Sequence, residues 1–304
     1  MSVFPTNEPE CTKAREATVD TVIEAKPRKI DGFEVGRALP AIARRHVGPF
    51  VFFDHMGPAQ LEPGHGMDVR PHPHIGLCTV TYLFEGEIVH RDSLGVVQSI
   101  RPGAVNWMTA GKGIVHSERT SAELRKSGSP LHGLQLWVAL MKEHEETDPA
   151  FQHCAAADLP ELSLEGVPVR VLAGSAYGAT SPVKTLSPLF YVEAKLRAGD
   201  RIALPTDHEE RGVYVVEGAL GCGPDRIERR RLMVFKPGAD VTLIAADDAR
   251  IVLLGGAPPD GQRHIWWNFV SSSKERMDQA KRDWEERRFA EVPGETERIP
   301  LPER

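Results

Sequence analysis

Cysteine is scarce and dispersed in this chain of 304 residues. The four cysteines, Cys11, Cys78, Cys154 and Cys222, form no CxxC pair. So few cysteines in a chain of this length are typical of a reducing compartment, and they exclude a disulfide-built scaffold. The first residues, MSVFPTNEPE, also lack the basic start and apolar core of a secretory signal. The expected location is therefore the cytoplasm.

Long apolar runs and an excess of basic residues are missing as well. No stretch approaches the roughly 18 uninterrupted apolar residues of a transmembrane helix. The formal net charge is −6 and the sequence pI is about 6.1, whereas nucleic acids and anionic membranes attract basic surfaces. We therefore expect no membrane partner and no direct contact with nucleic acid.

Glycine and proline are plentiful, with 27 and 24 residues spread evenly along the chain. Between them lie short runs of β-branched and aromatic residues, with turn signals every eight to twelve residues from 76 to 118. This pattern is typical of a β-sandwich or β-barrel. The segment 141–162 loses the pattern and is expected to be a linker, with at most a helical turn.

Two halves of the chain resemble each other. The run TYLFEGEIVH with IRPGAVNWM is echoed by VYVVEGALGC with VFKPGADVTL, so that Glu-Gly recurs about 132 residues later and a Pro-Gly turn follows each time. Such self-similarity predicts a duplicated β-domain. We expect an all-β protein, with a metal-binding domain in 1–150 and a metal-free domain in 151–304.

A single helix is expected near the C-terminus, within residues 271–289. Serines that could cap it precede the segment, and Met277, Ala280 and Trp284 fall on one helical stripe. The simplest interpretation of this stripe is packing against a β-domain.

The motif RPHPH places His72 and His74 at alternate positions around a proline. In a β-strand such residues point to the same face, so the two rings would share one space. The intervening proline suits the start of a strand or an edge strand. An isolated pair of this kind is more often a polar surface strand than a metal site.

A second pair of ligand-type residues strengthens the case for metal. His116 and Glu118 again alternate, and they follow His74 after 42 residues, which is room for about four short strands. An antiparallel barrel could bring the two strands together, so that three imidazoles and one carboxylate converge. The second half has His208 but no such pair, and we expect that half to hold no metal.

The run HPHIGLCTVTYLFEGEIVHRDSLG, continued by IRPGAVNWMTAGKGIVHSE, resembles the signature of the pirin family, a branch of the bicupins. GRALPAIARRHVGPFVFFDHMGP and HGLQLWV resemble the same family. The resemblance implies two tandem cupin (jelly-roll) β-barrels with a C-terminal helix. It also implies a divalent ion in the first barrel, with ligands at His72, His74, His116 and Glu118. The expected ion is Fe(II), with Mn, Ni, Co, Cu and Zn left open.

The resemblance implies two alternative functions. Some pirins are quercetinases, flavonol 2,4-dioxygenases that open the ring and release carbon monoxide, and Glu118 would then be the catalytic base as well as a ligand. Others are regulators whose metal responds to redox state and which bind a protein partner, such as a transcription factor or a metabolic enzyme. The partner is thus a flavonol-like small molecule or a protein, and the chain is expected to be a monomer.

For several residues near the motif, the sequence leaves open whether they line the site or pack in the core. Many pirins carry a glutamate where this chain has Cys78, which would face the pocket by strand parity but is more often a small buried hydrophobe. Phe53 and Met108 are expected in the core rather than the pocket, and His90 and Arg91 in a turn salt bridge with Asp92. Candidates for orienting the imidazoles by hydrogen bonds are Asp54, His55, Trp107 and Gln135.

Overall fold

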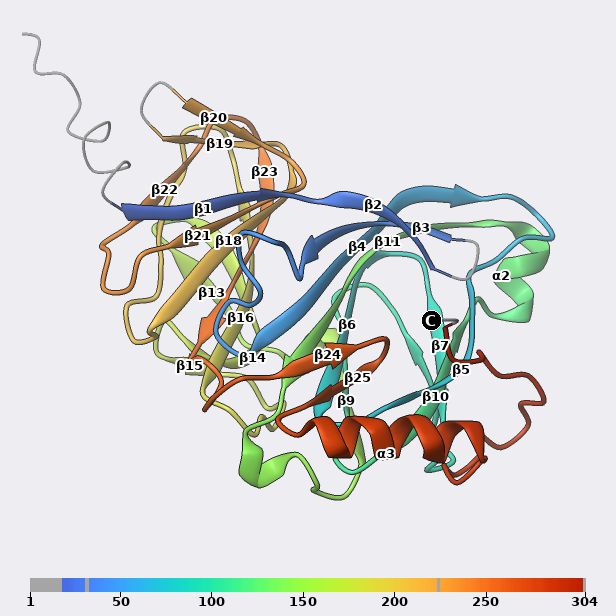
Figure 1. The fold of residues 1–304 in the computed structure, drawn as a ribbon. Helices are drawn as coiled ribbons and strands as arrows, with labels where there is room; N and C mark the ends of the chain where they lie inside the picture. Colours follow the sequence, from blue (N-terminus) through green and yellow to red (C-terminus); the bar gives the residue numbers. More distant parts are fainter. Residues whose placement is uncertain (1–17, 31–32, 223–224, 303–304) are drawn as a thin grey trace, which may run out of the picture.

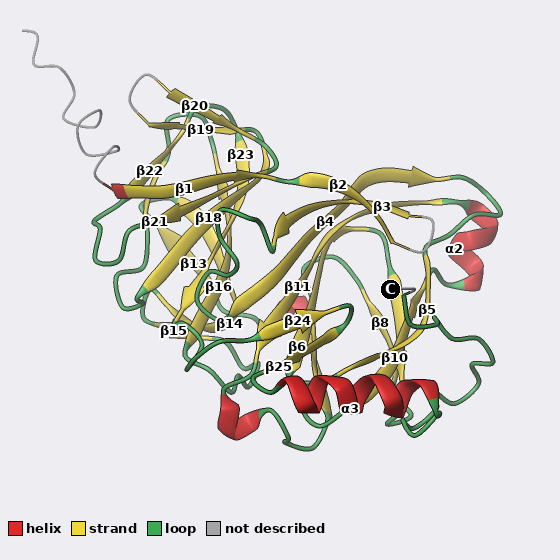
Figure 2. Cartoon of the chain, viewed as in Figure 1, coloured by secondary structure: helices red, strands yellow, loops and turns green. Residues whose placement is uncertain are grey.

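The computed structural model describes residues 18–30, 33–222 and 225–302, so Cys11 lies outside the described residues. Strands make up most of the chain, and α2 and α3, the α-helices with described bounds, are short (Figure 2). The strands form two β-barrels that lie next to each other, with β23 in one and β7 in the other (Figure 1). The expected all-β fold with two barrels and a C-terminal helix is confirmed.

The first barrel consists of a seven-stranded sheet facing a four-stranded sheet. In spatial order, the large sheet contains β12 (Ala150–Cys154), β9 (Val105–Thr109), β6 (Leu77–Glu85), β11 (Ser129–Ala139), β4 (Phe50–Leu61), β3 (Phe33–Leu39) and β2 (Lys26–Ile30). The small sheet contains β5 (Asp68–His74), β10 (Ile114–Arg119), β7 (Ile88–Asp92) and β8 (Val97–Ile100). A short helix, α2 (Ala122–Ser127), connects β10 to β11.

The second barrel repeats this order of strands. Its large sheet contains β1 (Val19–Glu24), β21 (Arg231–Phe235), β18 (Glu210–Glu217), β23 (Ala249–Gly256), β16 (Leu189–Leu196), β14 (Val167–Ala176) and β13 (Glu161–Leu164), with β15 (Ala179–Thr180) paired to β14. Its small sheet contains β17 (Arg201–Ala203), β22 (Thr242–Ala245), β19 (Ala219–Cys222) and β20 (Asp225–Glu228). Strand by strand, β6 therefore corresponds to β18, β5 to β17 and β10 to β22.

The repeated Glu-Gly turns occupy equivalent places in the two barrels. Gly86 follows β6 with φ of 87° and Gly218 follows β18 with φ of 72°. A Cβ on either glycine would lie 2.3 Å or 2.1 Å from a backbone carbonyl oxygen, so no larger residue fits. The Pro-Gly turns, by contrast, are not equivalent: Pro102-Gly103 precedes β9, whereas Pro237-Gly238 follows β21.

Both ends of the chain cross to the opposite barrel. β1 pairs with β21 in the second barrel (Figure 1). At the other end, the hairpin of β24 (His264–Trp266) and β25 (Phe269–Ser271) and helix α3 (Lys274–Glu285) pack against the first barrel. The division of the chain into two domains at residue 150 stays a prediction. The first described strand of the chain lies in the second barrel, and the last hairpin and helix lie against the first barrel.

Helix α3 begins after Ser273, whose Oγ accepts a hydrogen bond from the Arg276 backbone N–H at 3.1 Å. Its buried residues are Met277, Ala280 and Trp284, as the helical stripe predicts, and they pack against Ile75 and Val115 of the first barrel. Within the described residues, no helix combines the length and the apolar content needed to cross a bilayer.

The expected linker contains more structure than its sequence indicates. It includes two 3₁₀ turns, at Lys142–His144 and Ala156–Asp158, and β12 between them. β12 pairs with β9 and forms the edge of the first large sheet, the position that β1 takes in the second. The lack of a clear apolar pattern fits an edge strand, which is only partly buried.

The two barrels meet through a shared apolar core, to which Phe53 and Leu134 of the first and Leu172 and Leu254 of the second contribute, and buried polar contacts lie beside it. The Tyr82 hydroxyl donates to Glu193 at 2.7 Å. His55 lies 2.9 Å from the Tyr214 hydroxyl and 2.8 Å from the Nε2 of His132. Burial lowers the pKa of His55 to about 3 and that of His132 to about 4, so both rings are neutral at physiological pH.

Candidate metal centre

Two neighbouring strands of the small sheet carry the paired ligand-type residues. β5 and β10 are antiparallel, with His72 opposite His116. β5 is an edge strand, and it tolerates Pro71 and Pro73, which lack an N–H, because it has only one neighbour in the sheet. Alternation along each strand then points both pairs of side chains into the barrel.

The three imidazoles converge inside the barrel. One ring nitrogen from each of His72, His74 and His116 lies within 4.8 Å of the others, and all three rings are buried. The Nε2 atoms of His74 and His116 are 3.1 Å apart. Nitrogens that share one ion at about 2.0–2.1 Å from it stand roughly 3–4 Å apart. The donor set and its spacing therefore fit a single divalent ion.

Backbone carbonyls fix the orientation of two of these rings. The Nδ1 of His72 lies 2.8 Å from the Arg70 carbonyl oxygen, and that of His74 lies 2.9 Å from the Asn268 carbonyl oxygen. A carbonyl can only accept, so each Nδ1 carries the proton and each Nε2 presents a lone pair to the centre. Burial lowers the pKa of His74 and His116 far below the usual range, which keeps both rings neutral.

The third ring is oriented by a histidine behind it. His116 Nδ1 lies 3.4 Å from His90 Nδ1, and His90 Nε2 lies 2.9 Å from Asp92 Oδ2. If His90 donates to the carboxylate, its Nδ1 accepts from His116, which leaves the His116 Nε2 lone pair free for the centre. The expected contact of His90 with Asp92 is present and buried at the end of strand β7. Asp92 Oδ2 contacts His90 behind His116, while its Oδ1 accepts from the backbone N–H groups of Leu94 and Val96 in the turn that follows.

Glu118 lies on the same strand as His116, beyond an irregularity in pairing. β5 contains one extra residue there, so Glu118 faces Val69. The buried carboxylate accepts hydrogen bonds from Thr81 and Gln135, both at 3.3 Å, across the barrel on the large sheet. Burial raises the pKa of Glu118, while His90 and these two hydrogen bonds oppose the shift.

A cavity of about 490 Å³ opens beside the imidazoles. His72, His74, Glu118 and Gln135 line it together with aromatic and apolar side chains and two cationic ones; the rest of the lining is Lys29, Ile30, Phe33, Val35, Arg37, Phe52, Asp54, Met56, Met67, Val69, Trp137, Trp267, Asn268 and Ile299. A closed structural site would leave no such space. The arrangement suits a site that admits a small organic molecule next to a metal.

The remaining sequence-selected neighbours lie in the core rather than the cavity. Cys78 is buried on β6 beside Thr109, and Gly76, with φ of 67°, breaks the strand parity that would place it with His74. Burial raises the pKa of its thiol to about 11. Phe53 and Met108 are core residues, as expected.

The four candidates for orienting the imidazoles have other roles. Gln135 hydrogen-bonds Glu118 and Asp54 pairs with Arg37. His55 faces the second barrel, and the Trp107 Nε1 has no hydrogen-bond partner among the residues that the structure describes.

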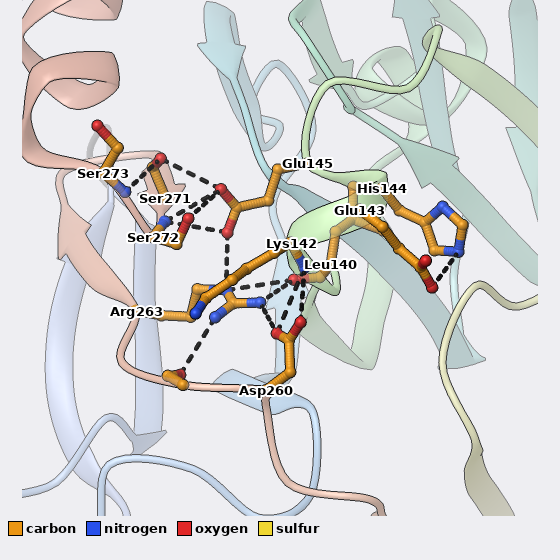
Figure 3. A network of polar contacts seen from close by, with 11 residues as sticks. Leu140, Lys142, Glu143, His144, Glu145, Asp260, Arg263, Ser271, Ser272 and Ser273 are labelled. Atoms are coloured by element: carbon orange, nitrogen blue, oxygen red, sulfur yellow. Dashed lines mark hydrogen bonds and ion pairs between the residues drawn. The ribbon is translucent and has the colours of Figure 1, made fainter.

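The hairpin that supplies the Asn268 carbonyl is anchored at its base by a buried ion pair. Arg263 lies 2.8 Å from Glu145, and both side chains are nearly inaccessible to solvent (Figure 3). Arg263 also donates to the Leu140 carbonyl, and Glu145 accepts from the backbone N–H and the hydroxyl of Ser272. Two three-residue strands are marginal alone, so this network holds the hairpin where it contacts His74. No local motif predicts it.

Comparisons with known proteins agree with this fold and site. The Pirin family model matches residues 32–138, and the model of the Pirin C-terminal cupin domain matches residues 191–290. A Pirin-like protein of Caulobacter vibrioides is 49% identical over 290 residues, covering 94% of this chain and all of the relative. Pirin of Rattus norvegicus is 33% identical, covering 83% of this chain and 87% of the relative. The crystal structure of quercetin 2,3-dioxygenase from Acinetobacter baumannii matches with a TM-score of 0.87 and 32% identity, covering 94% of this chain and 96% of that one.

Proposed function

The chain belongs to the pirin family of the cupin superfamily, and from this premise we propose that it is an iron-dependent dioxygenase of the quercetinase type, acting on flavonols. The observation that carries the proposal is the cluster of three imidazoles, two of which, His72 and His74, line an open cavity together with Glu118. A site that served structure alone would be closed. Solved structures that are named quercetin 2,3-dioxygenase add support.

In this proposal His72, His74, His116 and Glu118 hold one divalent ion, expected to be Fe(II). The ion would supply Lewis acidity to a 3-hydroxy-4-keto group and a centre for reaction with O₂. Three neutral rings leave the net charge of the ion to be offset mainly by Glu118. The other divalent ions named above remain compatible with this donor set.

Glu118 is the proposed general base. Its carboxylate lines the cavity, so a hydroxyl of a bound flavonol can approach it and transfer a proton to a carboxylate oxygen. Thr81 and Gln135 hold the same oxygen, Oε1, and thereby limit rotation of the carboxylate. Phe52 and Trp137 stack at 3.9 Å between ring centroids and provide a rigid aromatic wall for a planar substrate.

The test is turnover by the protein reconstituted with each metal in turn. Iron-loaded protein under air should consume 3-hydroxyflavones and release carbon monoxide, while metal-free protein should not. A 3-methoxyflavone, which cannot lose the hydroxyl proton, serves as the matched substrate control. Absence of turnover with every metal and several flavonols would contradict the proposal and favour the regulatory alternative, for which a pull-down dependent on the redox state of the metal is the test.

A further inference from the structure

Positive charge exceeds negative charge around the metal-loaded cavity. Besides the imidazoles and Glu118, the cavity is lined by two cations, Lys29 and Arg37, and by one further carboxylate, Asp54. Arg37 and Asp54 neutralise each other, and a divalent ion exceeds the charge of Glu118. The loaded cavity is therefore cationic, although the whole chain has a net charge of −6. A low-dielectric cavity of one sign concentrates ligands of the opposite sign.

Strand alternation and cross-strand pairing place Arg37 in this wall. Phe33, Val35 and Arg37 follow each other at every second position of β3, and all three line the cavity. Arg37 is directly opposite Asp54 in the register of β3 and β4. Its Nε and Nη2 donate to the two carboxylate oxygens at 2.8 and 2.7 Å. Asp54 is 1% exposed, whereas the Arg37 side chain is 26% exposed.

The bidentate pair leaves part of the guanidinium available. Of the five N–H donors of arginine, those on Nη1 find no acceptor among the residues that the structure describes. The geometry of the group is fixed, because Asp54 holds its edge and the ring of Phe52 lies under it at 4.3 Å. A guanidinium held in this way loses little conformational entropy when it binds an anion.

A continuous aromatic wall links Arg37 to the metal centre. Arg37 lies on Phe52, Phe52 stacks on Trp137, and Trp137 meets the ring of His74 edge-on at 5.2 Å. All four residues line the cavity. A planar molecule that chelates at the histidines would therefore extend along this wall toward the guanidinium.

From this arrangement we propose that the site selects flavonol-like aromatic ligands that carry an anionic oxygen group at the end remote from the chelating oxygens, with Arg37 as the anion-binding residue. This inference rests on the proposed function and adds the substrate class to it. The free Nη1 donors bind the anionic group, and Lys29 adds long-range attraction. Arg37 is thus a specificity-determining residue.

The experiment compares two probes, 3-hydroxyflavone and its 4′-carboxylate. Binding is measured by quenching of tryptophan fluorescence, since Trp137 and Trp267 line the cavity. The full chain is loaded with Zn²⁺ and kept without O₂, so that no turnover interferes. A charge-assisted hydrogen bond predicts that the wild type binds the carboxylate about 10-fold more tightly, with a preference that decreases in high salt.

The variants separate the role of Arg37 from stability. Arg37→Met together with Asp54→Asn removes both charges of the pair, so no unpaired charge is buried, and it should abolish the preference. Arg37→Lys should keep part of it. Lys29→Gln should reduce it about 2- to 3-fold through loss of screened attraction, and Lys126→Gln, the same charge change at an exposed position of α2 outside the cavity, should leave it unchanged. Circular dichroism and zinc content confirm that each variant is folded and loaded.

Retained preference in the double variant, no preference in the wild type, or no binding of either probe would overturn the inference. Its failure is distinguishable from failure of the proposed function. Turnover of both probes by the iron-loaded protein without a carboxylate preference would refute the inference alone. A carboxylate preference without any turnover would refute the dioxygenase proposal alone.

Discussion

The two barrels share one order of strands but differ in what occupies their interiors. In the first, the strand pair β5 and β10 carries three histidines and a glutamate. In the second, the equivalent pair β17 and β22 places Ile202 opposite Leu243, and both are buried in the apolar core. The fold is therefore maintained by aliphatic packing in one copy and accommodates a polar cavity in the other. The chemistry of such a protein depends on the site and not on the fold.

The second barrel has a histidine, His208, that has no counterpart role to the histidines inside the first barrel. It is the histidine of the second half that sequence reasoning considered as a ligand, and it lies outside the interior. Its Nε2 contacts the Ser175 carbonyl at 3.0 Å, and its ring packs on Phe190. No grouping of three ligand-type side chains occurs in the second barrel among the described residues.

The largest expected effect comes from removing an imidazole from the first barrel. His74→Ala or His116→Ala leaves two rings and a carboxylate, and we expect stoichiometric metal binding to be lost. His208→Ala is the matched control in the second barrel and should keep full metal content. Elemental analysis of the purified variants measures the effect. Full metal content in either of the first two variants would remove that residue from the ligand set.

A large effect on rate is expected for Glu118→Gln. The amide retains the size of the side chain and a weak oxygen ligand but cannot accept a proton at neutral pH. Loss of a general base typically costs roughly 10²–10⁴-fold in rate, so flavonol cleavage per bound iron should fall by that factor while some iron is retained. The exposed Glu123→Gln provides the control. Activity per iron near that of the wild type would show that Glu118 acts only as a ligand.

A truncation in the core of the second barrel should lower stability and leave metal binding unchanged. Leu243→Ala creates a cavity in an apolar core, and such truncations cost roughly 2–5 kcal/mol in the free energy of unfolding. Metal content per folded chain should not change, because Leu243 is far from the ligands in the topology. Denaturant titration gives the first quantity and elemental analysis the second. A loss of metal without a loss of stability would show that the core cluster around Leu243 is coupled to the ligands, although all its members lie in the second barrel.

Local sequence patterns account for much of the fold and part of the site. The alternation of His72 with His74, the Glu-Gly repeat and the stripe on α3 are each contained in a few residues. Strand periodicity or helix periodicity therefore suffices to predict them. The resemblance to the pirin family implied the same four ligand-type residues that the spacing suggested, whose convergence periodicity alone left open.

The features that sequence reasoning missed depend on contacts between distant segments. The Asn268 carbonyl reaches His74 from 194 positions away, and no side-chain pattern identifies a backbone acceptor. Cys78 is a buried core residue, as the sequence favoured; strand parity with His74 does not hold, because Gly76, with φ of 67°, interrupts the extended backbone between β5 and β6. The role of Arg37 can be inferred only once β3 is paired with β4, because that pairing places Arg37 opposite Asp54.

The smallest expected effect concerns the hairpin of β24 and β25, which presents the Asn268 carbonyl to His74. The chain leaves the second barrel after β23 and passes Arg263 before it reaches Asn268. The double variant Arg263→Met with Glu145→Gln removes the buried pair without stranding one charge, and the hairpin base should loosen. Because loss of a group that orients a ligand typically costs 10–100-fold in metal affinity, we expect a value near the lower end, about 10-fold, in a chelator competition. The exposed pair of Arg287 and Glu291 beyond helix α3, replaced by glutamines, is the control and should have no effect. Unchanged affinity in the buried double variant would instead mean that the apolar contacts of Phe269 and Val270 are sufficient to hold the Asn268 carbonyl against His74.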